Sequence, residues 1–397
     1  MPSESPEASG SLRTSVAQAF SDVFGSEPSG VWSAPGRVNL IGEHTDYNAG
    51  LCLPIALPHR TYAAARLRQD RQLRLHSLQS SESYSLELDD IRPGNPPGWG
   101  AYAAGVLWAL ETAGHQMQGL EVMVDGQVPV GAGLSSSAAL ECAVAAAVSD
   151  LMGLALLSDD HARAALASIC VNAENTIAMA PTGGMDQSAS LRCQEANALL
   201  LDCRDGSAQQ VPFDPSAHGL TLLVMNTRAK HSLVDGQYEQ RRTSCEEAAR
   251  RLGVTSLREV PVAGLDETLD RLSDIRIRAR ARHIVTEIDR VRQTEALLRA
   301  GRMSEVGSVF NASHASMRDD FEISCAELDV AVETATAHGA LGARMTGGGF
   351  GGSAIALVPA SSTTEVTSAV IHAFTDKGFG APDCFSVTAG GPARRES

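Results

Sequence analysis

The densest group of chemically active side chains lies between residues 37 and 46, where a guanidinium, two carboxylates and an imidazole occur together. They are Arg37, Glu43, His44 and Asp46, interleaved with apolar Val38, Leu40 and Ile41. An ionised carboxylate only accepts hydrogen bonds and can receive two donors, which suits adjacent hydroxyl groups on a sugar ring. We therefore predict Glu43 and Asp46 as sugar ligands. The alternative is a tight turn or helix start in which both carboxylates cap backbone amides and His44 lies at the surface.

A segment rich in glycine and serine at residues 131–138 has the composition of an anion-binding loop. Before it, residues 119–130 alternate apolar and polar side chains, which predicts a half-buried strand. After it, strong helix formers continue from Ala138 without glycine or proline. A helix start offers unpaired N–H groups and a positive dipole end to phosphates. We predict that nucleotide phosphates bind at Gly131, Gly133, Leu134, Ser135, Ser136, Ser137 and Ala138.

The three serines of this loop have more than one possible use. Their hydroxyls can cap the helix, and that of Ser136 or Ser137 could also ligate a magnesium ion. The alternative is that all three merely cap a core helix. The sequence has no P-loop lysine after the glycines and no His-Arg-Asp or Asp-Phe-Gly motif of protein kinases. Such a loop must neutralise nucleotide charge with amides, a metal ion and an arginine.

Two further segments contain glycine turns. Helix-forming residues from position 170 stop near Pro181, and a glycine turn then presents Asp186, which alone would be an ordinary turn aspartate. Residues 347–352 satisfy the Gly-x-Gly-x-x-Gly dinucleotide pattern. The apolar run at 353–359 predicts a strand, however, where that pattern requires a helix, so a dinucleotide site is rejected. A flexible hairpin is the alternative to a binding loop.

Residues 36–48, 129–139 and 345–352 together resemble the three signatures of the GHMP kinases. Residues 36–48 are similar to the galactokinase signature almost residue for residue, with Ala49-Gly50 in place of its usual glycine pair. The resemblance implies that the third segment lies near the phosphate loop and closes the active site. The resemblance also implies roles for individual residues. Those expected to bind galactose are Glu43, His44, Asp46, Gly183 and Tyr238. Asp186 is expected to be catalytic with Arg37 as its partner, and magnesium is expected to bind at Ser136, Ser137 and Glu174. Tyr238 could equally have a solvated hydroxyl, and Glu174 could lie on a solvated helix face.

The reaction that the resemblance implies is transfer of the γ-phosphoryl group of ATP, with Mg²⁺, to the anomeric hydroxyl of α-D-galactose, the first step of galactose catabolism. Such a transfer needs a positioned hydroxyl, neutralised phosphoryl charge and removal of a proton. Asp186 could remove the proton and Arg37 could neutralise the charge. A neighbouring arginine favours the ionised carboxylate and so weakens it as a base. Two roles of Asp186 therefore stay open: a general base and an electrostatic anchor.

Two alternatives to galactokinase activity are considered. A kinase for N-acetylgalactosamine or another sugar would share the fold, but those enzymes typically differ after the histidine, and Thr45 and Asn48 favour plain galactose. A non-catalytic sensor of galactose and ATP is the second alternative. Such relatives tend to have substitutions or deletions in the serine and alanine segment of the phosphate loop, whereas residues 135–139 of this chain keep that segment unchanged.

With 397 residues and 43% hydrophobic composition, the chain is long enough for two packed cores. The expected secondary structure changes along the chain. In the first half strands are followed by helices, and in the second half long helices come first and strands follow near the end. We predict an α+β protein with domains at 1–195 and 196–397. The resemblance implies a ribosomal-S5-like first domain, a ferredoxin-like second domain and an active site between them.

Composition excludes several other classes of protein. Apolar runs are too interrupted to span a bilayer. Residues 1–11 lack the features of a signal peptide and are expected to be a disordered tail. Eight scattered cysteines, several of them in apolar stretches, indicate free buried thiols, and no histidine spacing indicates zinc. The net charge of −15 argues against non-specific nucleic-acid binding, and the arginines at 276–292 are interpreted as a solvated helix face. We expect a cytoplasmic, monomeric enzyme with small-molecule substrates and neither membrane nor nucleic-acid partners.

Overall fold

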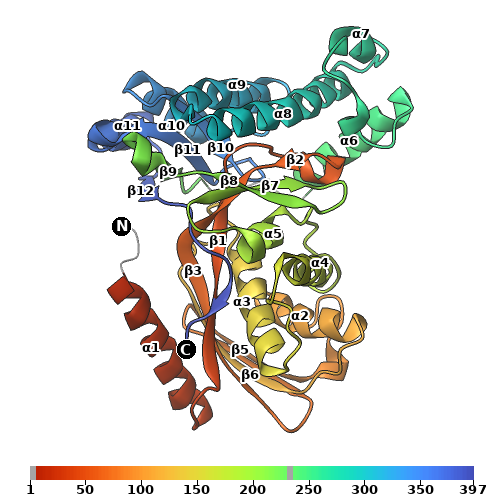
Figure 1. Ribbon diagram of the computed structural model, residues 1–397, viewed down its shortest axis with the longest axis vertical. Helices are drawn as coiled ribbons and strands as arrows, with labels where there is room; N and C mark the ends of the chain where they lie inside the picture. The colour runs from red at the N-terminus through yellow and green to blue at the C-terminus, as the bar shows by residue number, and fades with distance from the viewer. Residues whose placement is uncertain (1–5, 230–235) are drawn as a thin grey trace.

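The computed structural model describes residues 6–229 and 236–397. The first half is built on a six-stranded sheet in the order β13-β1-β3-β6-β4-β5, in which only β4 and β6 pair in parallel. The strands are β1 (Gly30–Asn39), β3 (Pro54–Leu67), β4 (Gln72–Ser77), β5 (Ser80–Glu87), β6 (Leu120–Gly126) and β13 (Arg394–Arg395). One side of this sheet carries α2 (Gly100–Thr112), α3 (Ser136–Leu151), α4 (Asp160–Thr176) and α5 (Met185–Arg192), and the other carries α1 (Pro6–Phe24) (Figure 1).

Strand β6 shows how these two layers enclose the sheet. The alternating segment at 119–130 is a strand only over Leu120–Gly126, and its side chains are buried on both faces, so the prediction of a half-buried strand is wrong. Val122 packs beneath α2 and α3, whereas Met123 faces α1. The polar residue Glu121 stays buried because two arginines each bond to its carboxylate at 2.7 Å.

Helix α1 corrects a second expectation. Residues 6–11 of the expected disordered tail belong to this helix, while residues 1–5 lie outside the described part of the chain. Val16 and Phe20, one turn apart, are fully buried against the sheet, where Tyr62 is among their neighbours. An apolar stripe of this kind orders a helix by packing, which composition alone does not reveal.

The second half is built on a four-stranded antiparallel sheet in the order β10-β11-β9-β12. Its strands are β9 (Leu220–Asn226), β10 (Gly342–Thr346), β11 (Ser353–Pro359) and β12 (Asp383–Val387). Its helices are α6 (Gln237–Leu252), α7 (Leu265–Leu269), α8 (Ile275–Arg299), α9 (Val306–Asp319), α10 (Ala326–Ala337) and α11 (Thr363–Lys377). A small sheet of β2 (Leu51–Cys52), β7 (Asn197–Asp202) and β8 (Ala208–Pro212) lies between the two larger sheets (Figure 1). The predicted α+β class is confirmed.

Two predicted elements of the second half are also confirmed. The apolar run at 353–359 is strand β11, and the arginine-rich segment lies in helix α8. The interpretation of those arginines as a solvated face fails at Arg280, which is 7% exposed and donates to Ser244 Oγ at 2.5 Å. This arginine contributes to packing between helices α6 and α8.

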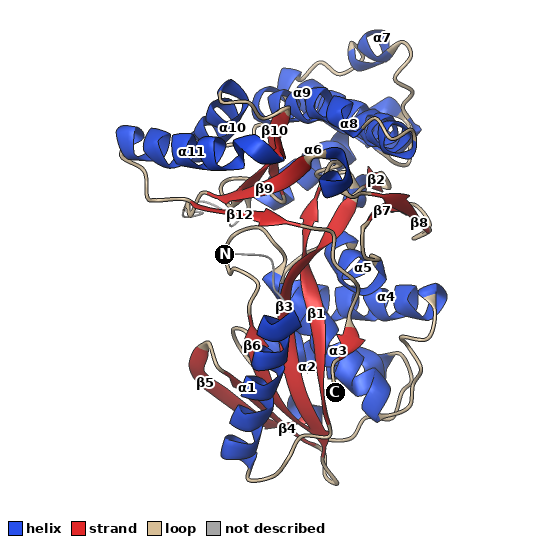
Figure 2. Cartoon of the chain, turned by 60° about the vertical axis from the view of Figure 1, so that its left-hand side comes forward, coloured by secondary structure: helices blue, strands red, loops and turns tan. Residues whose placement is uncertain are grey.

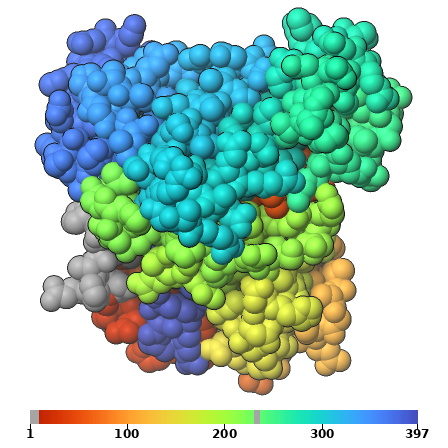
Figure 3. Space-filling model, turned by 45° about the horizontal axis from the view of Figure 1, so that its top comes forward, coloured from red at the N-terminus to blue at the C-terminus, as the bar shows by residue number. Residues whose placement is uncertain are grey.

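The end of the chain returns to the first sheet. Strand β13 pairs with β1 through Trp32 with Arg395 and Ser33 with Arg394. Figure 2 shows this return from a second direction, and Figure 3 shows the blue-violet C-terminal atoms beside red and yellow atoms of the first half. The predicted division between residues 195 and 196 stays a prediction.

The structure also bears on the membrane and thiol predictions. Among the described residues, no helix combines the length and apolar character needed to cross a membrane. All eight cysteines are free thiols, as predicted, but the predicted burial holds for only five of them, because Cys203, Cys325 and Cys384 are partly exposed.

Packing of α1 on the sheet predicts that Phe20→Ala lowers the free energy of unfolding by about 3–5 kcal/mol, the usual cost of truncating a buried phenylalanine. Urea denaturation followed by circular dichroism measures this loss. Val23→Ala on the same helix is the control, because Val23 is 47% exposed, and it should change stability by less than about 0.5 kcal/mol. Equal stability of the two variants would contradict the packing of α1.

Candidate active site

The end of strand β1 lies against the glycine and serine loop. The register of β1 on β3 shifts between Pro35 and Arg37, so the strand bulges and changes direction there. Gly36 permits the close approach, because a Cβ at this position would lie 2.5 Å from the carbonyl oxygen of Leu134. The backbone N–H of Arg37 donates to the same oxygen at 3.1 Å. The end of β1 is thereby fixed to the predicted phosphate loop.

The predicted catalytic residues Arg37 and Asp186 form a bidentate ion pair. Arg37 Nε lies 2.8 Å from Asp186 Oδ1, and Nη2 lies 3.0 Å from Oδ2. The remaining nitrogen, Nη1, donates to Gly133 O at 2.6 Å. Bidentate geometry fixes orientation as well as distance. One guanidinium therefore joins the carboxylate of Asp186 to the phosphate loop.

Asp186 is placed by the turn that precedes α5. Helix α4 ends at Thr176, before Pro181, and α5 begins at Met185. Gly184, immediately before α5, has a φ of +93°, which favours glycine. Asp186 is thus in the first turn of α5, and the predicted order of helix, glycine turn and Asp186 is confirmed.

The serines of the phosphate loop differ in part from the prediction. Helix α3 begins at Ser136, and Ser135 before it has a left-handed backbone (φ of 59°) with no side-chain capping bond. Its hydroxyl donates instead to Asp186 Oδ2. A capping role for Ser135 is therefore wrong, because the left-handed backbone turns its hydroxyl toward Asp186.

The third glycine segment packs on the phosphate loop. A Cβ added at Gly347 or Gly352 would lie 3.0 Å from the carbonyl oxygen of Gly133 or Ala132, respectively. Both glycines have positive φ values, 87° and 80°. Ser353 Oγ also donates to Ala132 O at 2.7 Å. The segment is thus a packed loop beside the phosphate loop, as the sequence resemblance implied, and the flexible-hairpin alternative is not supported.

Ser137 and Glu174, two of the predicted magnesium ligands, lie near each other, and the Ser137 hydroxyl acts to lower the pKa of Glu174. Gln187 Nε2 donates to Glu174 Oε2 at 2.5 Å and to Glu141 Oε2 at 3.1 Å. Burial and the charge of Asp186 raise the pKa of Glu174 to about 7. Glu174 is only 7% exposed, so the solvated-face alternative is wrong.

This donor set suits magnesium. Hydroxyl and carboxylate oxygens are hard ligands, and magnesium is commonly held by one or two carboxylates together with substrate phosphates. Within the two described ranges, no group of three or more His, Cys, Asp or Glu side chains could hold a metal. A divalent cation would also favour the ionised form of Glu174, which burial opposes.

Glu43 and His44 contact the third glycine segment. Glu43 Oε1 accepts from Gly347 N at 3.2 Å. His44 Nε2 lies 3.1 Å from Gly348 O, and its Nδ1 lies 2.8 Å from the hydroxyl oxygen of Tyr47. Burial lowers the pKa of His44 to about 4, so the ring is neutral near pH 7. The alternative that places His44 at the surface is wrong.

Asp46 begins a 3-10 turn at Asp46–Asn48 and lies against Gly183. A Cβ at Gly183 would fall 2.0 Å from Asp46 Oδ2, so only glycine permits this approach. Burial, reinforced by the charge of Asp186, raises the pKa of Asp46 to about 6. The structure therefore places Gly183 beside a predicted sugar ligand.

Tyr238, in the first turn of α6, completes the wall of the site. Its ring centre lies 5.0 Å from that of His44 and 5.6 Å from that of Tyr47. A cavity of about 200 Å³ is lined by the functional candidates Arg37, Glu43, His44, Asp46, Glu174, Asp186 and Tyr238. A second cavity, of about 320 Å³, shares Tyr238 with it and is also lined by Gly133 and residues 348–351. The sugar-ligand candidates and the catalytic pair therefore line one polar space beside the phosphate loop.

A buried charge cluster that sequence analysis missed supports this space. Arg344 on β10 is fully buried and donates to Leu40 O at 2.6 Å and to the Glu43 carboxylate. Glu287 on α8, also fully buried, accepts from Gly42 N at 3.1 Å and lies 3.4 Å from Arg344 Nη2. The cluster holds the segment that follows β1 from two elements of the second half.

The charges of this cluster compensate one another. Burial acts to raise the pKa of Glu287, but the charges of Arg290 and Arg344 lower it to about 2. Burial raises the pKa of Glu43, and Arg344 opposes that rise. Two features of the sequence could have indicated this cluster: Arg344 lies within an apolar strand, and Glu287 lies on the same helix face as Ile284.

Comparison with known proteins places these features among sugar kinases. The chain matches the galactokinase galactose-binding signature over residues 18–67, the GHMP kinase N-terminal domain over 101–194 and the GHMP kinase C-terminal domain over 294–376. It is 51% identical to the galactokinase of Streptomyces coelicolor over 382 residues, covering 96% of this chain and 97% of the relative. It is 45% identical to the galactokinase of Mycobacterium tuberculosis, covering 88% and 95% of the two chains. The crystal structure of Lactococcus lactis galactokinase complexed with galactose superposes with a TM-score of 0.91 at 31% identity, covering 97% of this chain and 100% of that one.

The charge cluster predicts a large stability loss for Arg344→Met, because the buried Glu43 carboxylate would lose its cation and the buried Glu287 carboxylate would keep only Arg290. We expect the free energy of unfolding in urea to fall by about 3–5 kcal/mol. Adding Glu43→Gln should restore part of this loss, since an amide needs no counter-charge. Arg250→Met, which removes an arginine with a 71% exposed side chain paired to Glu247, is the control and should cost less than about 1 kcal/mol. A loss no larger than that of the control would contradict the role of the cluster.

Proposed function

Because the chain belongs to the galactokinases of the GHMP kinase family, we propose that this kinase transfers the γ-phosphoryl group of ATP to the anomeric hydroxyl of α-D-galactose. One observation carries the proposal. Glu43, His44 and Asp46 line the same cavity as the Arg37–Asp186 pair, beside the loop that begins α3. Similarity to a galactokinase solved with galactose supports the choice of sugar. The product is galactose 1-phosphate.

We propose that the galactose hydroxyls bind to Glu43 and Asp46. Glu43 Oε1 already accepts from Gly347 N at 3.2 Å and from Thr346 Oγ1 at 3.3 Å, whereas Oε2 accepts from Arg344. A carboxylate oxygen can accept two donors, so Oε2 has the capacity left for a galactose hydroxyl. His44 uses both ring nitrogens within the protein and would reach a hydroxyl by exchanging one of these bonds. Tyr238 and residues 180–182, before the glycine turn, line the remaining sides of this cavity, whereas the predicted sugar contact Gly183 lines a separate cavity.

In the proposed reaction the anomeric oxygen attacks the γ-phosphorus, the bond from phosphorus to the bridging oxygen breaks, and ADP leaves. Asp186, fixed by Arg37 and Ser135, orients the anomeric hydroxyl and accepts its proton. Arg37 places positive charge between this hydroxyl and the phosphate loop, where charge on the transferred group must be neutralised. The protein supplies mainly positioning and electrostatic stabilisation.

We propose that the ATP phosphates bind at residues 131–138, where the N-terminal amides and dipole of α3 favour anions. Ser137 and Glu174, with Ser136 as the alternative serine, would hold magnesium. Magnesium supplies neutralisation of the phosphate charge when it is bound with ATP. The third glycine segment covers this side of the site.

We further propose a cytoplasmic location and a monomeric chain. The free state of all eight cysteines is usual in a reducing compartment.

The proposal is tested by ATP consumption with magnesium against galactose, glucose, N-acetylgalactosamine, mevalonate and homoserine, with NMR identification of any phosphorylated sugar. Galactose-dependent turnover to galactose 1-phosphate supports the proposal. Activity only on another acceptor would overturn the sugar assignment. Binding of galactose and ATP without turnover would identify a sensor and contradict the proposed reaction.

Asp186→Asn keeps the size of the side chain and removes its capacity to accept a proton. We expect kcat to fall by at least about 100-fold, the scale of general acid–base catalysis, while the Kd for galactose in calorimetry changes less than about fivefold. Ser188→Ala, on the same helix but lining a different cavity, should keep normal turnover. Normal turnover of Asp186→Asn would refute its catalytic role.

Galactose binding should weaken as the pH falls through about 6, because the pKa of Asp46 is raised to about 6 and only its ionised form accepts two hydroxyl donors. Calorimetry between roughly pH 7.5 and pH 5 should show Kd rising by up to about tenfold per unit below that pKa. Asp46→Asn should bind weakly throughout and lose this rise. The same rise in Asp46→Asn would assign the titration to another group and contradict the role of Asp46.

A further inference from the structure

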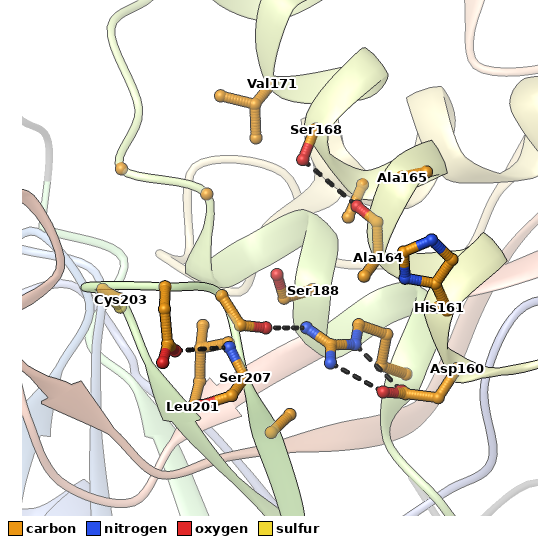
Figure 4. Close-up of a pocket in the computed structure, with 17 residues that line it drawn as sticks. Asp160, His161, Ala164, Ala165, Ser168, Val171, Ser188, Leu201, Cys203 and Ser207 are labelled. Atoms are coloured by element: carbon orange, nitrogen blue, oxygen red, sulfur yellow. Dashed lines mark hydrogen bonds and ion pairs between the residues drawn. The ribbon is translucent and has the colours of Figure 1, made fainter.

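A cavity of about 760 Å³ lies outside the proposed active site, and its walls come from α4, α5 and the hairpin of β7 and β8 (Figure 4). Gly183 and Gly184 line this cavity, whereas Thr182 and Asp186 line the proposed galactose cavity. The turn at residues 182–186 therefore separates the two spaces. A cavity of this volume can admit small molecules to the rear of the catalytic turn.

Cys203 lines this cavity (Figure 4) and lies close to a second thiol. It is partly exposed, and its Sγ is 3.9 Å from the Sγ of Cys52, which is fully buried. The ladder of β2 and β7 holds the two sulfurs together. Cys52 pairs with Leu201, two residues before Cys203, and Cys203 N donates to Gly50 O at 2.9 Å. The backbone therefore fixes this thiol pair.

We propose that Cys203 is a thiol–disulfide exchange site for low-molecular-weight disulfides that enter this cavity, with Cys52 as the resolving thiol. The Cys203 thiolate attacks one sulfur of the small disulfide, forms a mixed disulfide and releases one small thiolate. Cys52, once deprotonated, attacks the Cys203 sulfur, closes the Cys52–Cys203 disulfide and releases the second. The two cysteines are oxidised, the small disulfide is reduced to two thiols, and the two protons lost by the cysteines are taken up by these products.

The surroundings of the two sulfurs assign the roles. Hydrogen bonding to Cys203 and burial raise the pKa of the Cys52 thiol well above its usual range. Cys52 therefore keeps its proton and is the poorer attacking thiol. Of the two residues, only Cys203 lines the cavity. Cys203 is thus the attacking thiol and Cys52 the resolving one.

The resolving thiol also contacts the segment that carries the proposed sugar ligands. Cys52 Sγ lies 3.3 Å from Thr45 Oγ1 and 3.5 Å from Gly42 O, and these two residues flank Glu43 and His44 in the chain. A disulfide requires sulfurs about 2.05 Å apart, so Cys52 moves toward Cys203 and loses these contacts. This consequence rests on the proposed function: oxidation weakens galactose binding and leaves ATP binding unchanged.

Other cysteines provide the comparison. Cys142 and Cys170 also contact each other, but both are fully buried, so a small disulfide cannot reach them. Cys384 is partly exposed and lines a separate cavity at β12. It is the matched control for an accessible thiol that has no resolving partner at hand among the described residues.

The test incubates the reduced, full-length protein with glutathione disulfide and maps its thiols by peptide mass spectrometry. We expect a linked Cys52–Cys203 peptide pair, and a KM for galactose that rises by roughly two- to tenfold, the effect of losing about one hydrogen bond. The KM for ATP should stay unchanged, and dithiothreitol should restore the reduced value. Cys203→Ser should keep basal turnover and lose the response, whereas Cys384→Ser should keep both.

Failure to find the linked peptide under conditions that modify Cys384 would overturn the proposal, as would a full galactose response in Cys203→Ser. A complete linkage with an unchanged galactose KM would overturn the coupling to the sugar segment. Thiol mapping needs no enzymatic activity. Absence of galactose turnover in the reduced protein would therefore count against the proposed function and not against the exchange site.

Discussion

The buried ion pair between Arg344 and Glu43 is the contact on which the arrangement of the site depends. Arg344 lies on a strand of the second sheet, Glu43 lies in the segment that follows β1, and Glu287 of α8 joins them. Buried charges are costly unless they are paired and hydrogen-bonded. The segment is therefore stable in the position where Glu43 and Gly42 meet these partners. Once it is fixed there, the side chains that follow line the cavity.

The same strand couples the proposed galactose site to the proposed phosphate loop. Strand β10, which carries Arg344, continues directly into the glycine segment at 347–352. Gly347 donates to Glu43 and also packs against Gly133 of the phosphate loop, while Arg37 connects that loop to Asp186. One continuous set of polar contacts and close backbone approaches thus holds the proposed sugar ligands, the proposed catalytic pair and the proposed phosphate loop. This geometry suits a reaction in which positioning and charge neutralisation supply most of the catalysis.

Sequence analysis located most of the candidate site because its chemistry is concentrated in short contiguous segments. The helix after the serine loop, the turn before Asp186 and strand β11 were predictable because glycine, proline and apolar spacing act locally. Arg344 and Glu287 were missed because each is a single charged residue in an otherwise apolar element. They come together only in the tertiary structure.

The incorrect expectations have similar causes. The half-buried pattern of β6 gave no sign that α1 covers its second face, since that depends on the packing of a segment about one hundred residues away. The capping preference of serine was overridden at Ser135 by a left-handed backbone that turns the hydroxyl to Asp186. In both cases tertiary contacts decide between local alternatives that the sequence alone leaves open.

The most direct test of the account is a crystal structure with galactose and a non-hydrolysable ATP analogue. The account predicts galactose hydroxyls on Glu43 and Asp46, with the anomeric oxygen within hydrogen-bond distance of Asp186 and facing the γ-phosphate at the loop that begins α3. A sugar bound in this cavity with its anomeric oxygen directed away from Asp186, or bound elsewhere, would contradict it.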